Sequence, residues 1–359
     1  MGNLVIFSGI VEILLVLSTL LAIFMVTAHF SRNPHWSVRM FDFPVKQLVS
    51  SQLILTTTLA LLVITTAYQL PLWWLMLANI PTIILLYSIY PYTIFHRKDL
   101  KTASGSGESI RLLSANVFMY NNDYQRLIDQ IDKNQPDCIL LLETDLNWLK
   151  GLEEIEAAYP YTLKYPLANT YGLLFYSKYK LLEPQIRFIL KSDIPSIKTR
   201  LELAPGLTTW FYGVHPEPPS PTESESSEPR DIELLMLARE IRKLNGPVIF
   251  AGDFNDVAWS HTTRLFRRYS GLLDPRVGRG SFSTFHVKYP LFRWPLDHCF
   301  LSSHFRINEM QVLPSIGSDH FPMLIDMNLD PDHNHHTPMA QPEDVAEVVD
   351  KLEHAEEYD

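Results

Sequence analysis

A carboxylate and a carboxamide stand two residues apart at Asp253 and Asn255, shortly after the apolar run Val248–Ala251. A short apolar run bounded by proline and glycine is typical of a buried strand. Residues two apart in an extended segment point to the same face, so both side chains would face one ligand. A carboxylate beside an amide suits a hard cation and a phosphate oxygen. The alternative is an Asp/Asn turn at the end of a strand.

Other apolar runs of the chain also end in, or are followed by, polar side chains that could do chemistry. The full set is Asn116, Glu143, His215, Asp253, Asn255, Asp297, Asp319 and His320. Each residue alone has a structural interpretation as a cap or turn residue. Together they are two amides, four carboxylates and two imidazoles. Because sites of α/β domains lie at strand ends, we expect these side chains to converge.

The elements that must position these residues follow a strand, helix, strand pattern. Residues 110–117 predict a strand, residues 123–133 have helical spacing and stop before Pro136, and residues 138–142 predict a second strand. The pattern predicts an α/β domain. Further strands are predicted over 172–176, 188–191, 199–203, 208–214, 281–285, 296–302 and 323–327, with a helix over 231–244.

The segment 216–229 differs from the elements on either side of it. It consists largely of proline, serine and glutamate. It is too long for a simple turn, so it predicts a long loop beside the site.

The first 95 residues predict a membrane section. Three apolar runs, about 4–26, 48–68 and 70–94, are each long enough for a transmembrane helix. Buried globular helices are the alternative, which the presence of three such runs disfavours. Glu12 is the one charged residue of the first run. It is either a functional group within the membrane or a helix-packing contact.

Basic residues predict the orientation of this section. Arg32, Arg39 and Lys46 lie between the first two runs, and Arg97, Lys98 and Lys101 follow the third. Loops rich in lysine and arginine lie on the cytoplasmic side. We therefore expect an integral protein of the inner or plasma membrane whose catalytic domain is cytoplasmic.

Composition divides the rest of the chain. A small and polar segment, 96–106, predicts a flexible linker between the membrane section, 1–95, and a soluble domain, 107–327. The tail, 328–359, holds ten acidic residues and one lysine and predicts a helix over about 342–356. The net charge is -10, and the soluble domain is weakly acidic. That is not the footprint of a dedicated nucleic-acid binder.

Seven motifs occur in one order along the soluble domain. They are Ser114-Ala115-Asn116-Val117, Leu142-Glu143, Tyr171-Gly172 before Ser177, Val214-His215-Pro216, Gly252-Asp253-Phe254-Asn255, Leu296-Asp297-His298 and Gly317-Ser318-Asp319-His320-Phe321-Pro322. In residue types and order they resemble the endonuclease/exonuclease/phosphatase superfamily, the DNase I-like fold, in a membrane-anchored form of bacterial type. The resemblance covers about 107–327. One departure is Leu142, where the family often has glutamine.

The resemblance implies a fold and a reaction. The fold is a four-layer α/β sandwich, with two packed central sheets flanked by helices, here preceded by three transmembrane helices. The reaction is hydrolysis of a phosphoester by in-line attack of water on phosphorus, with Mg²⁺ or Mn²⁺ as cofactor. By resemblance, Glu143 would be the main metal carboxylate, with Asn116 beside it and Asp319 completing the metal site.

The resemblance also implies catalytic roles. Asp253 and Asn255 would position the nucleophile and the phosphate oxygens. His320 would be the general base or an electrostatic partner, held by Asp297. His215 would donate to the scissile phosphate or protonate the leaving oxygen.

Two further residues are expected to bind substrate. Arg230 lies in a predicted helix that fits the family's arginine-containing helix. His298 follows Asp297 directly, and a structural role is its alternative.

The substrate is left open, because one fold hosts many chemistries. The membrane section favours a lipid bilayer as partner and a phosphoester that is lipid-linked. Nucleic acid is a less favoured substrate. The alternatives are a membrane-tethered nuclease, a non-catalytic membrane scaffold that retains the fold, and a transport or sensing protein. The oligomeric state is left open.

Overall fold

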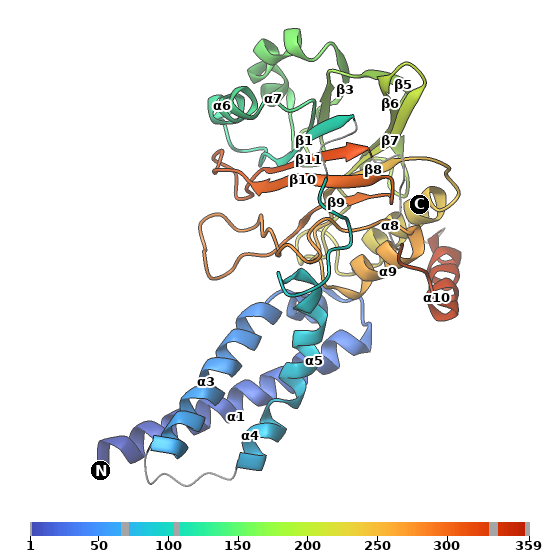
Figure 1. Ribbon diagram of the computed structural model, residues 1–359. Helices are drawn as coiled ribbons and strands as arrows, with labels where there is room; N and C mark the ends of the chain where they lie inside the picture. Colours follow the sequence, from blue (N-terminus) through green and yellow to red (C-terminus); the bar gives the residue numbers. More distant parts are fainter. Residues whose placement is uncertain (1, 66–71, 104–107, 330–336, 356–359) are drawn as a thin grey trace.

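Two mixed β-sheets pack face to face in the computed structural model, which describes residues 2–65, 72–103, 108–329 and 337–355 (Figure 1). The first sheet has the strand order β10-β11-β1-β2-β4-β3, and the second has the order β5-β6-β7-β8-β9. The first sheet comprises β1 (Ser109–Asn116), β2 (Cys138–Leu142), β3 (Tyr161–Tyr165), β4 (Leu173–Ser177), β10 (Phe305–Val312) and β11 (Met323–Leu329). The second comprises β5 (Lys180–Phe188), β6 (Pro195–Ala204), β7 (Leu207–Val214), β8 (Val248–Asp253) and β9 (Asp297–Leu301).

Helices cover the outer face of each sheet. On the first sheet lie α6 (Tyr124–Asn134) and α7 (Leu146–Gly151), and on the second lie α8 (Glu228–Ile241) and α9 (His261–Ser270). Between the sheets the core is apolar, and the rings of Phe175 and Phe211 stack across it with centroids 4.3 Å apart. The predicted α/β sandwich of two packed sheets flanked by helices is confirmed.

Strand direction creates the edge at which the polar residues meet. β1 pairs with β2 in parallel, and β7 pairs with β8 in parallel. The carboxyl ends of parallel strands meet at one edge of a sheet. β1 and β2 also pack against β8, so the two edges lie together.

The prediction of three transmembrane helices is wrong in its third member. Two described helices are long and apolar enough to span a membrane, over Ile6–Ser31 in α1 (Gly2–Ser31) and over α3 (Val45–Thr65). The third apolar run forms α4 (Leu72–Ala78) and α5 (Ile80–Ile89), which meet at Asn79. Pro81 lacks a backbone N–H and interrupts the helical hydrogen bonds there. A ten-residue helix is about 15 Å long, half the hydrocarbon core of a bilayer.

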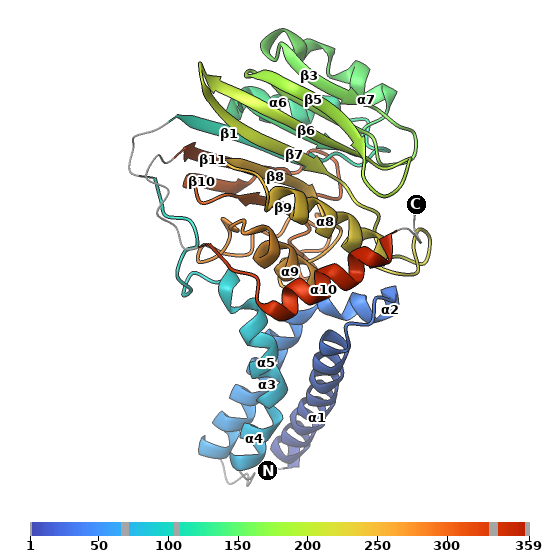
Figure 2. The same cartoon turned by 90° about the vertical axis from the view of Figure 1, so that its right-hand side faces the viewer.

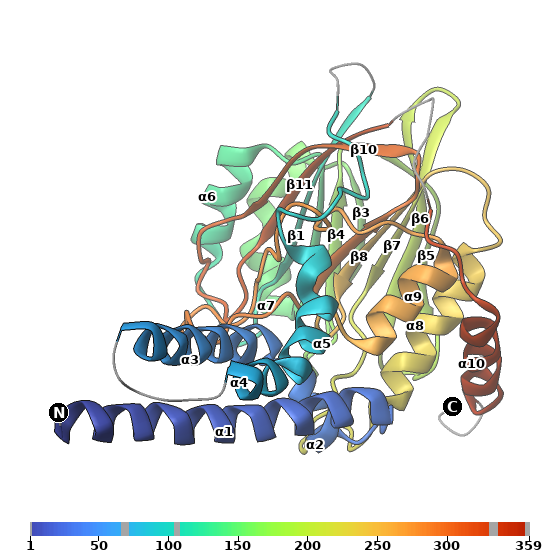
Figure 3. The ribbon, with the colours of Figure 1, turned by 60° about the horizontal axis from the view of Figure 1, so that its bottom comes forward.

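These helices pack side by side as one bundle (Figure 3). Gln52 of α3 is buried and donates from Nε2 to the Thr19 hydroxyl, at 2.9 Å, and to the Ala78 carbonyl, at 3.1 Å. The outer faces remain apolar and exposed, with Leu17 57%, Ile54 66% and Ile83 61% accessible.

The bundle and the soluble domain share an apolar core, called here the junction cluster. It joins Met25 of α1 and Val49 of α3 to Trp259 and Val277 of the soluble domain. Trp259 Nε1 donates to the Asp42 carbonyl at 2.7 Å. The bundle therefore packs on the domain through buried side chains.

The predicted flexible linker, 96–106, differs from the structure in its described part, 96–103. Leu100 is buried in the core between the sheets, Asp99 forms an ion pair with Arg267, and the Ala103 N–H donates to the Ile307 carbonyl at 3.0 Å. These contacts hold residues 99–103 on the domain. The rest of the small polar segment, 104–106, lies outside the described residues, so flexibility there stays a prediction.

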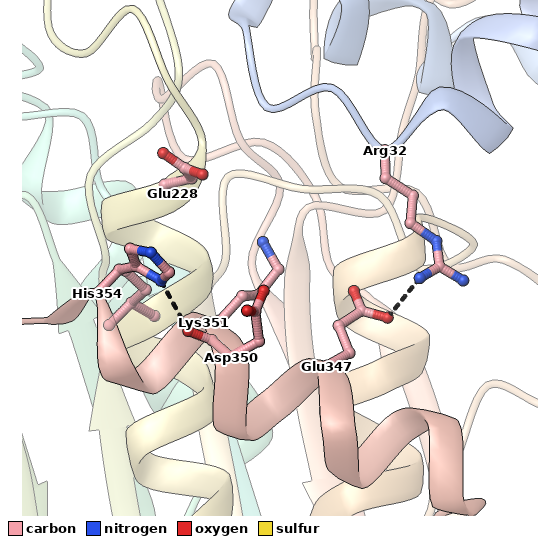
Figure 4. Close-up of a pocket in the computed structure, with 7 residues that line it drawn as sticks. Arg32, Glu228, Glu347, Asp350, Lys351 and His354 are labelled. Atoms are coloured by element: carbon pink, nitrogen blue, oxygen red, sulfur yellow. Dashed lines mark hydrogen bonds and ion pairs between the residues drawn. The ribbon is translucent and has the colours of Figure 1, made fainter.

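The acidic tail forms α10 (Pro342–Glu353), which lies along α8 and α9 near the end of α1 (Figure 2). Val348 is fully buried in the core beneath those helices. Asp344 pairs with Arg268 at 2.7 Å. Glu347 pairs with Arg32 at 2.9 Å (Figure 4). The tail thus touches both the domain and the residue that follows α1.

Glu233 on α8 predicts how stability depends on pH. It is 3% exposed, and its Oε1 has no hydrogen-bond partner among the described residues. Burial, and then the Glu217 carboxylate, raise the pKa of Glu233 from 4.5 to about 8. The native state therefore keeps a proton that the unfolded state releases, so this contribution to stability is complete below pH 4.5 and is lost as pH rises through 8.

Glu233→Gln is expected to stabilise the protein above pH 7 by roughly 1–3 kcal/mol and to flatten the pH dependence. Unfolding of the full chain in detergent, followed from pH 5 to pH 9, measures this. Glu225→Gln is the matched control, because Glu225 is exposed. Equal pH profiles for the wild-type protein and Glu233→Gln would contradict the prediction.

Candidate active site

Asn116 and Glu143 come from the parallel strands of the first sheet. Asn116 ends β1 and lies opposite Leu142, so Glu143 follows at the adjacent strand end. Asn116 Nδ2 donates to Glu143 Oε1 at 2.8 Å and to Asp253 Oδ2 at 3.2 Å. This buried amide therefore links the carboxylates of the two sheets.

Asp253 and Asp297 come from the second sheet, where they face each other as the last residue of β8 and the first of β9. Both are buried, at 0% and 1% exposed. Gly252 precedes Asp253 with φ +154°, and a Cβ there would meet the Val214 carbonyl oxygen at 1.9 Å. Glycine is required because the two parallel strands approach so closely at their ends.

His320 completes the centre of the cluster from the segment before β11. Its Nδ1 lies 2.8 Å from Asp297 Oδ2, and its Nε2 lies 3.6 Å from Asp253 Oδ2. Ser318 holds the segment, since its hydroxyl donates to the Asn116 carbonyl at 2.8 Å and accepts from the His320 N–H at 3.0 Å.

The electrostatics of the cluster favour a protonated His320. Burial alone would lower its pKa, but the Asp297 and Asp253 carboxylates outweigh burial and raise the pKa to about 10. The imidazolium can donate to a phosphate oxygen. A cation among the same carboxylates would weaken their pull on that proton.

The donor set fits a hard divalent cation. Carboxylate and amide oxygens are the ligands that Mg²⁺ prefers. Burial raises the pKa of Glu143, while His215 and the Asn116 amide oppose that rise. Asp297 Oδ1 is buried without a hydrogen-bond partner among the described residues, which a cation or its water would supply.

The distances between side-chain ligand atoms indicate a different candidate metal site. Within the described ranges, one group of three acidic or histidine side chains has ligand atoms within 4.8 Å of one another, namely Asp253, Asp297 and His320. His320 Nδ1 already bonds Asp297, so its Nε2 is the ring nitrogen that faces Asp253. Glu143 lies outside this group, so a cation site at Glu143 and Asn116 stays a prediction. Asp319 is half-buried beside His320 and lies outside this group.

Asn255 and His215 lie at the rim of the cluster. The Asn255 N–H donates to Asp253 Oδ1 at 2.8 Å, and its Nδ2 donates to the Pro216 carbonyl at 3.1 Å. Asn255 thus joins β8 to the residue after His215. His215 is 4% exposed, and its Nδ1 has no hydrogen-bond partner in the described parts of the chain. That nitrogen is available to a ligand.

Arg230 does not lie at the surface of the site, contrary to the prediction that it binds substrate. It is 1% exposed, and it pairs with Asp231 at 2.9 Å and with Asp256 at 3.1 Å. Its Nη1 donates to the Asn255 carbonyl at 2.9 Å. A guanidinium engaged in this way positions the loop that carries Asn255 instead of contacting substrate.

His298 is also buried beneath the site, so its predicted contact with substrate is replaced by the structural alternative. Arg276 Nη2 donates to its Nδ1 at 2.7 Å, and its Nε2 donates to the Asp256 carbonyl at 2.9 Å. The ring stacks on Phe254 at 4.4 Å. Burial and then Arg276 lower the pKa of His298 well below its ordinary value, which keeps the imidazole neutral.

Three supporting residues were not predicted from the sequence. Arg276 and Asp274 form a fully buried ion pair at 2.8 Å, and Arg276 Nη1 also donates to the Asp297 carbonyl. Phe285 packs on His320, with ring centroids 4.8 Å apart. Asp274 and Arg276 follow no apolar run of strand length, so a search for polar residues at the ends of such runs does not find them.

Comparisons with known proteins agree with this geometry. The model of the Endonuclease/Exonuclease/phosphatase family matches residues 113–320. A comparison with curated proteins found no match.

Solved structures share the fold. A humanised TDP2 of D. rerio is 18% identical and aligns with 62% of this chain and 99% of its own, with a TM-score of 0.53. An endonuclease/exonuclease/phosphatase family protein from Bacteroides thetaiotaomicron is 18% identical over 65% of this chain and 99% of its own, with a TM-score of 0.51. The human Nocturnin catalytic domain is 16% identical and aligns with 62% of this chain and 96% of its own, with a TM-score of 0.50.

Proposed function

Because the chain belongs to the Endonuclease/Exonuclease/phosphatase family, we propose that it is a divalent-metal-dependent phosphoester hydrolase held at a membrane. The observation that carries the proposal is one contact. The Asn116 amide bonds both Glu143 of the first sheet and Asp253 of the second. It thereby joins a cation-binding carboxylate to the Asp253, Asp297 and His320 cluster.

The chemistry divides among these residues. Hydrolysis at phosphorus requires neutralisation of charge on the phosphate oxygens. Mg²⁺ or Mn²⁺ bound by Glu143 and Asn116, with Asp319 nearby, would supply part of that charge. Asp253 orients the attacking water and accepts its proton. His320 and His215 donate hydrogen bonds to the phosphate, and Asp297 fixes the His320 ring.

The membrane part of the proposal rests on the bundle. Both long helices keep large apolar side chains exposed on their outer faces, which a core helix of a water-soluble protein would bury. After α3, the helices α4 and α5 together lead back along the bundle to the soluble domain (Figure 1). The basic residues that follow α1 and those that follow α5 therefore lie at the same end of the bundle, which favours a cytoplasmic catalytic domain. These features support a lipid-linked phosphoester over nucleic acid as the substrate.

Hydrolysis by the full-length protein in detergent tests the function. The substrates are bis(p-nitrophenyl) phosphate, plasmid DNA and mixed phospholipid vesicles, each with Mg²⁺, Mn²⁺ or EDTA. Metal-dependent turnover of the small ester or the lipids supports the proposal. Turnover of DNA alone would establish a membrane-tethered nuclease. Neither turnover nor Mn²⁺ binding would establish a non-catalytic scaffold.

Glu143→Gln is expected to weaken Mn²⁺ binding by at least about 10-fold, because an amide replaces the main carboxylate ligand. Calorimetric titration of the full chain with MnCl₂ measures the affinity. Glu154→Gln makes the same chemical change at an exposed position and should bind Mn²⁺ as the wild-type protein does. Unchanged affinity in Glu143→Gln would remove Glu143 from the metal site.

A further inference from the structure

An apolar pocket of about 360 Å³ lies between the segment 281–294 and two short helices that follow α1, namely α2 (Trp36–Arg39) and η1 (Met40–Asp42). Its apolar wall is formed by Trp36, Met40, Phe43, Pro219, Phe292 and Trp294. Two of these side chains are half exposed, Met40 at 50% and Phe292 at 51%. A mainly apolar pocket of this size with few polar groups is typical of a binding site for a small molecule.

One buried charge lines the same pocket. Arg39 is 8% exposed and donates to the Asn33 carbonyl at 2.6 Å and to Asp42 Oδ2 at 3.2 Å. Its Nη2 has no hydrogen-bond partner among the described residues. Arg39 is the one charged side chain in the lining of this pocket among the described residues, and it is held in place by these two bonds.

The pocket adjoins the catalytic cluster through two rings. Phe43 packs on Trp294 at 5.5 Å between ring centroids. Trp294 pairs with Phe285, whose N–H donates to the Trp294 carbonyl at 3.1 Å. Phe285 in turn packs on His320. A ligand in the pocket is therefore separated from the catalytic histidine by the Trp294 and Phe285 side chains.

The pocket also lies at the end of a helix that we propose crosses the membrane. The wall residue Phe43 is two residues before Val45, the first residue of α3. Lys46 donates to the Ser281 hydroxyl at 2.8 Å, and Gln47 donates to the Leu291 carbonyl at 2.8 Å. These contacts hold the segment 281–294 against the start of α3. Leu291 is 79% exposed there, as suits an interfacial side chain.

We propose that this pocket binds a hydrocarbon chain of a membrane phospholipid and so holds a lipid substrate beside the catalytic cluster. Arg39 places a positive charge in the pocket lining, which favours an anionic phospholipid. The pocket opens beside the end of α3, where a lipid chain is available, and the catalytic histidine lies behind its inner wall. The inference rests on the proposed function for the identity of the substrate, but binding of the chain can be measured without turnover.

Photo-crosslinking of the full-length protein tests the inference. The probe is phosphatidylglycerol with a diazirine on one acyl chain, in phosphatidylethanolamine vesicles with EDTA so that metal-dependent hydrolysis is blocked. Cross-linked peptides are expected from 36–44 and 292–294. Phe292→Ser should lower that yield about 10-fold, because the lipid chain loses an aromatic contact. Leu291→Ser is the matched control and should leave the yield unchanged, since Leu291 does not line the pocket.

Two outcomes would overturn the inference. One is cross-linking confined to the outer faces of α1 and α3, and the other is equal yields from Phe292→Ser and Leu291→Ser. Hydrolysis of bis(p-nitrophenyl) phosphate with Mn²⁺ separates this failure from failure of the proposed function. Turnover without cross-linking in the pocket leaves the function and refutes the lipid site. Cross-linking in the pocket without any turnover leaves the site and refutes the function.

Discussion

The His320→Ala variant is expected to hydrolyse bis(p-nitrophenyl) phosphate about 10²- to 10⁴-fold more slowly than the wild-type protein. The reason is positional. His320 lies between the carboxylates of Asp297 and Asp253, and alanine removes the protonated donor that they hold. Steady-state kinetics of the full chain with saturating Mn²⁺ measures kcat. The loss should fall mainly on kcat, because the imidazolium meets charge that develops in the transition state.

Two controls separate catalysis from folding. His304→Ala removes an imidazole that lies outside the cluster, at the start of β10, and should keep full activity. Thermal unfolding of His320→Ala shows whether the fold survives the change. A folded His320→Ala variant with kcat within threefold of the wild-type value would exclude His320 from the reaction.

Asp274→Asn is expected to lower the free energy of unfolding by about 3–5 kcal/mol. Asp274 and Arg276 are both fully buried, and two parallel bonds join them, Nε to Oδ1 at 2.9 Å and Nη2 to Oδ2 at 2.8 Å. An amide leaves the guanidinium charge buried without a counter-charge. Chemical unfolding of the full chain in detergent measures the change.

An exposed pair gives the matched comparison. Glu183→Gln makes the same chemical change in a pair with Arg200, where the Glu183 side chain is 59% exposed. Exposed ion pairs contribute about 0–1 kcal/mol, so little change is expected. The interpretation of Arg276 as a buried support fails if Asp274→Asn costs no more than Glu183→Gln. Because Arg276 also bonds His298 and the Asp297 carbonyl, a partly folded Asp274→Asn variant should lose activity as well.

The residues that meet at the site could be found from the sequence because most of them end apolar runs. Asn116, Glu143 and Asp253 each follow four or more buried residues, and a buried strand leaves few places for polar groups except its ends. The sequence could not reveal how deeply each of these side chains is buried. Arg230 and His298 lie next to the same motifs along the chain, yet both are buried under the site.

Elements without a regular apolar pattern were missed. β10 has a bulge between Ile307 and Glu309, which breaks the alternation that identifies a strand. The predicted strand over 281–285 forms isolated bridges instead, where Phe285 meets Trp294 and His320. The break at Asn79 did have a signal, since Pro81 lies within the third apolar run. The prediction of one continuous helix over 70–94 rested on the apolar content of that run and did not take the proline into account.

The junction cluster has a kinetic consequence. Trp259 lies two residues before α9 and is buried in one cluster with residues of α1 and α3, so the catalytic domain is not free to rotate relative to its anchor. In the proposed membrane setting, the active site then stays at one height and one tilt above the bilayer. Its encounters with a lipid are governed by lateral diffusion in two dimensions. Turnover should follow the mole fraction of substrate in the membrane and not its bulk concentration.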